Sequence, residues 1–170
     1  MLLCIFLVPG TEYLYSQPFP REKVIAAFIF NFVKHIEWRN EKEISRFKFK
    51  IITGNKRIVD ELNKIAVKKG IRNKVTTITS ENRLTNIENV QLIYVGKDKE
   101  KLFADIFYRI EGKNILLISD GYKNKKIVMI NLYDTQDKRV EFEINRANII
   151  NQGLTILPNM VLLGGTEIDV

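Results

Sequence analysis

The side chains that could carry acid–base, nucleophilic or metal chemistry are scarce in this sequence. His35 is the only histidine, so a catalytic triad or a multi-histidine metal site would have to be built through it. Cys4 is the only cysteine, which excludes an intrachain disulfide and a cluster of thiolate ligands. Glu141 and Glu143 alternate with apolar residues, and a half-buried strand explains this spacing without general acid–base catalysis. The sequence therefore predicts a protein that is not an enzyme, with no catalytic residue, metal site or cofactor.

Two strand-to-helix turns offer a different chemistry, the binding of an anion. The turns contain Gly54 and Gly96, in the sequences GNKR at 54–57 and VGKD at 95–98. Unpaired N–H groups at the start of a helix attract phosphate and carboxylate groups. Neither turn matches the GxGxxG or the Walker pattern, and most turns of this kind bind nothing. A small-molecule or anion-binding sensor domain that works with a histidine kinase is the alternative interpretation of this chain.

A third set of polar side chains lies on one face of a predicted helix. Residues 21–38 contain no Gly or Pro and are apolar around most of the helix, which predicts a mostly buried element. The exceptions follow i, i+3, i+4, i+7 spacing and are Asn31, Lys34, His35 and Trp38. Lys34, His35 and Trp38 are candidate partner contacts, because aromatic and cationic side chains anchor protein interfaces. The alternative is that Trp38 closes the core and Asn31 satisfies a buried backbone group.

A last set of candidate residues lies near the end of the chain. Asn145 is predicted to cap a helix over 146–152, and Gly153 is predicted to end it. Arg146, next to the cap, is a candidate for contacting an acidic partner. The pair Gly164-Gly165 is predicted to be a flexible end and not a phosphate-binding loop. These residues add one candidate contact and two structural motifs.

The elements that must position these side chains alternate between strands and helices. Alternation of this kind favours a partly parallel sheet that is covered on both faces. We therefore predict an α/β fold, a single three-layer domain with a mixed sheet whose last strands form an antiparallel edge. The predicted strands are 47–52, 74–79, 90–96, 114–119, 127–132 and 139–144, and the predicted helices are 21–38, 57–69, 99–110, 146–152 and a short turn at 160–163.

The composition fits one domain with a solvated basic surface. The chain has 170 residues, is 45% hydrophobic and carries a formal net charge of +7. Its densest basic stretches, KKGIRNK at 68–74 and KNKK at 123–126, are loop-like, and most other cations are interleaved with Glu or Asp. We therefore expect no nucleic-acid partner, and a cytoplasmic nucleic-acid binder is the alternative that the charge leaves open.

The beginning of the chain has the pattern of an export signal. Residues 1–8 form a compact apolar run, far shorter than the roughly 20 apolar residues of a membrane span. The run is typical of the centre of a secretory signal peptide, with cleavage between Ser16 and Gln17, although no Lys or Arg precedes it. We expect a signal peptide at 1–16, an α/β domain at 17–170 and a periplasmic location. A buried strand at the same place is the alternative.

Two segments, one near each end of the chain, carry a family pattern. The first is AAFIFNFVKHIEW at 26–38, and the second is VEFEIN at 140–145, followed by GLTI at 153–156 and LL at 162–163. The first resembles the opening helix of the YfiR family, and the second resembles the closing strand, Asn-led helix and Leu-Leu end of that family. Their separation also fits, and the resemblance extends from 22 to 163.

The resemblance implies a function that the residues alone do not give. Members of the YfiR family are periplasmic α/β domains, commonly homodimers. Their best-understood role is to repress a membrane-bound diguanylate cyclase by binding its periplasmic region, which lowers cyclic di-GMP and disfavours biofilm. Related domains occur beside sensor kinases, so the implied partner is a membrane-bound signalling protein, either a diguanylate cyclase or a sensor kinase.

This chain departs from the family pattern in two respects. The pair of small polar residues that usually precedes Leu-Leu is replaced by LPN at 157–159, which affects the C-terminal packing or a partner surface. The cysteines that stabilise some relatives are absent, so the resemblance does not imply redox control through disulfides.

Overall fold

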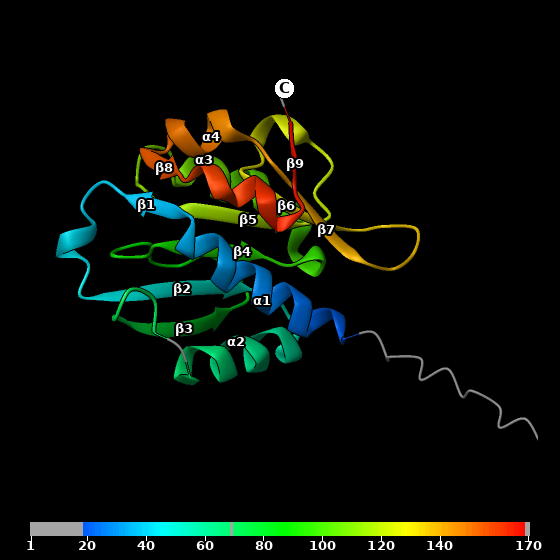
Figure 1. Cartoon of the computed structure of the whole chain (residues 1–170), viewed down its shortest axis with the longest axis horizontal. Helices are drawn as coiled ribbons and strands as arrows, with labels where there is room; N and C mark the ends of the chain where they lie inside the picture. The colour runs from blue at the N-terminus through cyan, green and yellow to red at the C-terminus, as the bar shows by residue number, and fades with distance from the viewer. Residues whose placement is uncertain (1–18, 69, 169–170) are drawn as a thin grey trace, which may run out of the picture.

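The computed structural model describes residues 19–68 and 70–168 (Figure 1). The predicted signal peptide at 1–16 and its cleavage site lie outside these residues. In the described part, the α-helices are α1 (Arg21–Lys34), α2 (Lys56–Lys68), α3 (Phe103–Arg109) and α4 (Arg146–Asn151). The strands are β1 (Ile36–Trp38), β2 (Arg46–Ile52), β3 (Val75–Glu81), β4 (Leu92–Val95), β5 (Leu116–Asp120), β6 (Ile130–Asp134), β7 (Val140–Ile144), β8 (Leu154–Ile156) and β9 (Thr166–Glu167). The 3-10 helices are η1 (Glu41–Glu43), η2 (Lys97–Leu102), η3 (Lys125–Ile127) and η4 (Pro158–Leu163).

Seven of the described strands form one mixed sheet in the order β3-β2-β4-β5-β6-β7-β9. The first five strands in this order are parallel, β7 is antiparallel to β6, and β9 is parallel to β7. β1 and β8 form a separate antiparallel pair, in which Ile36 lies opposite Ile156 and Trp38 opposite Leu154. The predicted mixed, partly parallel sheet is confirmed. The antiparallel strand β7 is not the edge, because β9 lies outside it.

The direction of the chain along the sheet reverses between β2 and β4. From β2 the chain crosses through α2 to β3, and from β4 it crosses through α3 to β5 in the opposite direction. Parallel crossovers are right-handed, so two crossovers in opposite directions place their helices on opposite faces of the sheet. α1 packs beside α2 (Figure 1). The predicted three-layer arrangement follows, with its reversal point at the carboxyl ends of β2 and β4.

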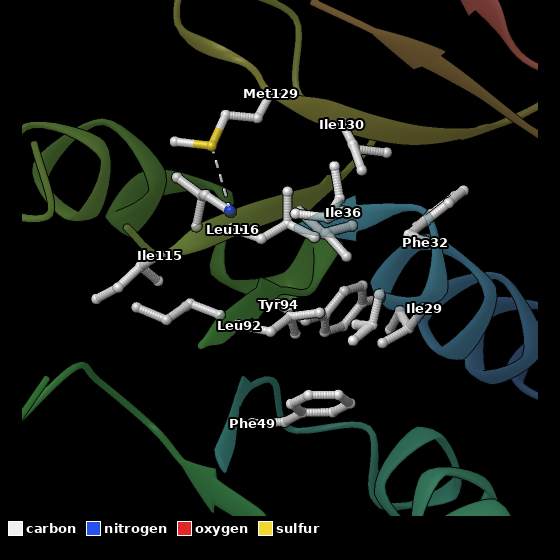
Figure 2. Packing of buried hydrophobic residues seen from close by; sticks show 14 of the residues in the cluster. Ile29, Phe32, Ile36, Phe49, Leu92, Tyr94, Ile115, Leu116, Met129 and Ile130 are labelled. Carbon is white, nitrogen blue, oxygen red and sulfur yellow. Dashed lines mark hydrogen bonds between the residues drawn. The ribbon is translucent and has the colours of Figure 1, made fainter. Parts of the chain in front are cut away.

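The core fills both faces of the central strands. Every residue of β4 and β5 is buried, as parallel strands covered on two sides require. In Figure 2 the side chains of Ile29 and Phe32 from α1 face the strands that carry Phe49, Tyr94 and Leu116. All five of these side chains have no solvent exposure. Apolar packing therefore fixes which side of α1 faces inward and which side remains outside.

The predicted helix at 21–38 is too long. α1 ends at Lys34, and the next residues form β1, which pairs with β8. An apolar run cannot by itself distinguish a buried helix from a buried strand, and here the pairing with β8 decides. The end of the helix is also fixed from outside, because the guanidinium of Arg72 donates to the carbonyl oxygens of Lys34 at 3.2 Å and Ile36 at 2.7 Å. Such donors satisfy the carbonyl groups that a helix leaves unpaired.

The predicted helix at 99–110 is divided. It begins as the 3-10 helix η2 and becomes α-helical only at Phe103, with non-helical backbone angles at Lys99. The reason lies in Asp98, whose carboxylate is bound by the hydroxyl of Thr53 at 2.6 Å and the N–H of Gly54 at 2.7 Å. This side chain holds the first turn against the end of β2. The other predicted elements differ from the structure by a few residues at their ends.

The prediction that Gly164-Gly165 is a flexible end is wrong. Gly165 leads into β9, which pairs with β7 through Thr166. A Cβ atom at Gly165 would overlap the ring of Phe142, which is 1% exposed. Gly165 is therefore the residue that lets the last strand approach the core.

Candidate partner-binding surface

The predicted polar stripe of Asn31, Lys34, His35 and Trp38 does not exist as one exposed face. Trp38 belongs to β1, is 5% exposed and packs edge-on against Phe47 at 5.3 Å between ring centroids. Its expected role as an exposed anchor is corrected, because the helix ends before it and strand pairing turns it inward. The interpretation of Trp38 as a core residue is the one that the structure supports.

Lys34 and His35 lie at the C-terminal end of α1, close to Asn31. Lys34 is exposed and its Nζ donates to Asn31 Oδ1 at 3.2 Å. His35 is half-buried, and its Nδ1 lies 2.9 Å from the carbonyl oxygen of Asn31. Asn31 is half-buried and contacts these neighbours through both its side chain and its backbone. Of the predicted stripe, Lys34 remains the side chain most available to a partner.

Arg146 lies on a different element from α1. Its guanidinium forms an ion pair with Glu167 of β9 at 2.7 Å, and this hydrogen bond raises the pKa of Arg146. Asn145 caps α4, accepting from the N–H of Asn148 at 3.0 Å, and Gly153 follows the helix with a φ of +78°. The predicted cap and stop of this helix are thus observed. Arg146 fastens the last strand to the domain, so it is not a free cation.

The outer side of α1 carries an apolar surface that the sequence did not single out. Figure 1 shows α1 lying across the outside of the sheet. Phe19 is 69% exposed, Ala27 is exposed, and Val24 and Phe28 are half-buried. We call these four residues the α1 strip. They line a shallow hollow of about 320 Å³ together with Lys23 and Asn31. An exposed apolar surface with a polar rim is typical of a site of protein–protein contact.

The α1 strip is presented on a rigid support. The ring of Phe28 stacks on Phe32 at 5.7 Å and meets Phe142 edge-on at 5.1 Å, so the part of Phe28 that remains exposed is fixed in orientation. Lys23 places its ammonium group 4.8 Å from the ring centroid of Phe19. A preorganised surface loses little conformational entropy when a partner binds.

The first residue of α1 is anchored by a partly buried ionic network. Arg21 donates to both carboxylate oxygens of Asp120, at 2.6 and 3.0 Å, and to Asp134 at 2.6 Å. The hydroxyl of Tyr94 donates to Asp120 at 3.0 Å. The hydrogen bonds to Asp120 raise the pKa of Arg21, and burial raises the pKa of Tyr94 well above its usual range. Both groups therefore keep their protons and hold α1 against the carboxyl end of β5.

The two turns predicted as anion sites lie side by side at the carboxyl edge of the sheet. This is the reversal point at which open α/β sheets bind ligands. A hollow of about 250 Å³ lies there, but the N–H of Gly54 already donates to Asp98. Burial raises the pKa of Asp98, but the hydrogen bonds from Thr53 and Gly54 outweigh it and leave the pKa lowered. The chain's own carboxylate therefore takes the place of an external anion at the Gly54 turn.

The two basic stretches contribute cations to the fold. Arg72 binds the end of α1 and pairs with Glu41 of η1, and Lys74 donates to the backbone oxygen of Glu41. Lys125 pairs with Glu143 of β7. These cations hold loops to the sheet and to α1, so the stretches at 68–74 and 123–126 are not simple free basic patches.

The part of the chain that the structure describes contains neither a cluster of metal ligands nor a helix that could span a membrane. Within these residues, His, Cys, Asp and Glu side chains form no group of three or more that would hold a metal ion. None of the helices in residues 19–68 and 70–168 combines the length and apolar character that a bilayer crossing requires.

The fold and the surface define the class of the protein as a three-layer α/β domain whose exposed chemistry suits contact with another protein. Residues 22–164 match the family model described as YfiR/HmsC-like, and this match covers most of the chain. The protein belongs to the YfiR/HmsC-like family. The family is regulatory and non-catalytic, and at the family level it supports a periplasmic regulator of a diguanylate cyclase. A search of curated proteins found no match.

The α1 strip was missed because its residues look like core residues in the sequence. Val24, Ala27 and Phe28 follow i, i+3, i+4 spacing, which is the spacing of a buried stripe. The sequence did contain a signal for this surface, namely an excess of apolar residues in the helix. Residues 21–34 are apolar over more of the helix than one packed face needs, and the surplus must either meet a second layer or remain exposed.

Proposed function

We propose that this protein is an exported regulator that binds the periplasmic part of a membrane-bound diguanylate cyclase, represses it and so lowers cyclic di-GMP. The protein has no catalytic activity of its own in this proposal. The observation that carries it is the α1 strip, an exposed apolar surface in a domain of a regulatory family. A sensor kinase is the second kind of partner that the family resemblance supports.

The chemistry of the α1 strip indicates what the partner surface contains. The centre is apolar, its lining includes Lys23 and Asn31, and the ammonium group of Lys34 is bound to Asn31. A complementary partner places apolar side chains at the centre and carboxylates at the rim, because unlike charges at the rim steer association and fix its register. His35 caps the C-terminal end of the same helix.

A substitution in the middle of the α1 strip tests the proposal. Ala27→Glu puts a charge in the apolar centre, and the matched control Ala147→Glu makes the same change at an exposed alanine of α4. We expect deletion of the gene to raise cellular cyclic di-GMP, and expect wild type and Ala147→Glu, but not Ala27→Glu, to restore the low level. An unchanged level of cyclic di-GMP after deletion would contradict repression. Full rescue by Ala27→Glu would show that the interface does not lie on α1.

Export is tested separately by mass spectrometry of the protein recovered from fractionated cells. Cleavage before Gln17 would leave Phe19 near the start of the mature chain. We expect a periplasmic protein that begins at Gln17, whereas an intact Met1 in the cytoplasm would contradict the proposed location.

A homodimer is also part of the proposal, on the strength of the family resemblance. Sedimentation equilibrium of the purified protein should give the mass of two chains, and the mass of one chain would contradict the dimer.

A further inference from the structure

A further cavity lies at the opposite end of the strands from the Gly54 and Gly96 turns, where the parallel strands begin. It has a volume of about 560 Å³ and is formed by the loop before β2, the first residues of β2 and the segments that lead into β4 and β5. It shares no lining residue with the α1 strip or with the hollow at the carboxyl edge. We call it the amino-edge cavity.

The charged side chains of the amino-edge cavity are mostly cations. Arg46, Lys48 and Lys113 line it, against a single carboxylate from Glu43. None of these three cations forms an ion pair with a residue of the described ranges, whereas Lys50, next on the same face of β2, is paired with a glutamate. Like charges brought to one cavity repel one another, and an anionic ligand removes that repulsion.

The buried part of the lining is polar and held in place. Gln91 is 7% exposed, and its Oε1 accepts from the N–H of Lys48 at 2.8 Å, which fixes the amide. Trp38 also lines the cavity and is 5% exposed, so its indole ring forms part of the cavity wall. A fixed amide and a fixed ring give the cavity a preorganised wall, which lowers the entropy cost of binding a ligand.

We propose that the amino-edge cavity binds a small organic polyanion, of the class of di- and tricarboxylates, as an effector of this regulator. The cations meet the carboxylates, and the fixed amide of Gln91 offers a neutral polar contact. The volume lies within the usual range for small-molecule sites. The effector site does not depend on the proposed partner, because it is built from residues outside the α1 strip.

The fluorescence of Trp38 reports on this site, because it is the only tryptophan in the chain. The probe is citrate, titrated into the purified full chain at constant ionic strength, with glucose as the uncharged control. We expect a saturable change in Trp38 emission with citrate and none with glucose. The double variant Arg46→Ser/Lys113→Ser should weaken citrate binding by about tenfold, because two of the three cations are lost.

Two further variants separate binding from damage to the fold. Glu43→Gln removes the only carboxylate of the cavity and should tighten citrate binding by about threefold. Lys123→Ser removes one exposed cation outside the cavity and should leave the affinity unchanged. A response to citrate that does not saturate, or equal affinities for wild type, Glu43→Gln and the double variant, would overturn the effector site. Neither result would affect the test of the α1 strip.

Discussion

The charged side chains at the two edges of the sheet, where the parallel strands end and where they begin, differ in whether they have partners within the protein. At the carboxyl edge, Arg21 is bound by two aspartates and Asp98 is bound by a hydroxyl and a backbone N–H, so both of these charges have partners. At the amino edge, Arg46, Lys48 and Lys113 line a cavity with no ion-pair partner among the described residues. Arg21 and Asp98 at the carboxyl edge thus stabilise the fold, whereas the three cations at the amino edge are not paired with any described residue.

This difference shows why topology alone does not locate a site. The reversal point of an open α/β sheet is where ligands are expected. In this protein the polar groups at that place are bound by Asp98 and by the Arg21 network, which fasten helices to strands. In many α/β proteins the carboxyl ends of the strands form the functional site. In this protein they hold α1 in position, and α1 carries the candidate contact surface.

The strongest test of this comparison removes the centre of the network at the carboxyl edge. Asp120→Ala leaves Arg21 and Tyr94 without their shared partner, and the side chain of Asp120 is only 3% exposed. We expect the free energy of unfolding to fall by about 3 kcal/mol, because the buried hydroxyl of Tyr94 loses its acceptor and Arg21 loses two of its charged hydrogen bonds, keeping only Asp134. Urea denaturation measures the change. Asp137→Ala, which breaks the exposed pair with Arg139, is the control and should cost less than about 0.5 kcal/mol.

The next test asks whether Asp98 really occupies an anion site. Asp98→Ala frees the N–H of Gly54 and the hydroxyl of Thr53, and should lower the free energy of unfolding by about 1 to 2 kcal/mol. Inorganic phosphate should then raise the melting temperature of the variant but not that of the wild type. If phosphate has no effect on either protein, the turn is purely structural.

The pH dependence of stability tests whether the ionised carboxylate of Asp98 stabilises the Gly54 turn. The pKa of Asp98 is lowered by folding from its usual 3.8, so its contribution to stability is present above that pH and is lost as pH falls through the lowered pKa. The difference in unfolding free energy between wild type and Asp98→Asn should therefore be constant near neutral pH and shrink in acid below about pH 4. Denaturation curves recorded across this range measure it, and a difference that persists in acid would exclude the carboxylate as the cause.

The smallest effect on stability is expected at the amino edge. The double variant Arg46→Ser/Lys113→Ser breaks no ion pair between described residues and should change the free energy of unfolding by less than about 0.5 kcal/mol. A loss comparable to that of Asp120→Ala would mean that these cations are structural, and the contrast between the edges would disappear.

Sequence patterns predicted the elements better than they predicted exposure. The strands at β4 and β5 are apolar runs bounded by turns, and they lie in the sheet as expected. Trp38 was misplaced because the apolar run around it satisfies both a helix and a strand, and only the distant partner Leu154 decides between them. The α1 strip was missed for a related reason, since spacing identifies an apolar face without identifying what covers it.

The closing contacts of this fold join distant parts of the chain. Arg21 and Asp120 are 99 positions apart, and β1 pairs with a strand that begins only at Leu154. The pairing of Arg21 with Asp120 and of β1 with β8 cannot form until most of the chain has been synthesised. Contacts of such high sequence separation make folding slow, because loop closure precedes the gain from packing. The native state therefore cannot close while the C-terminal third of the chain is still missing.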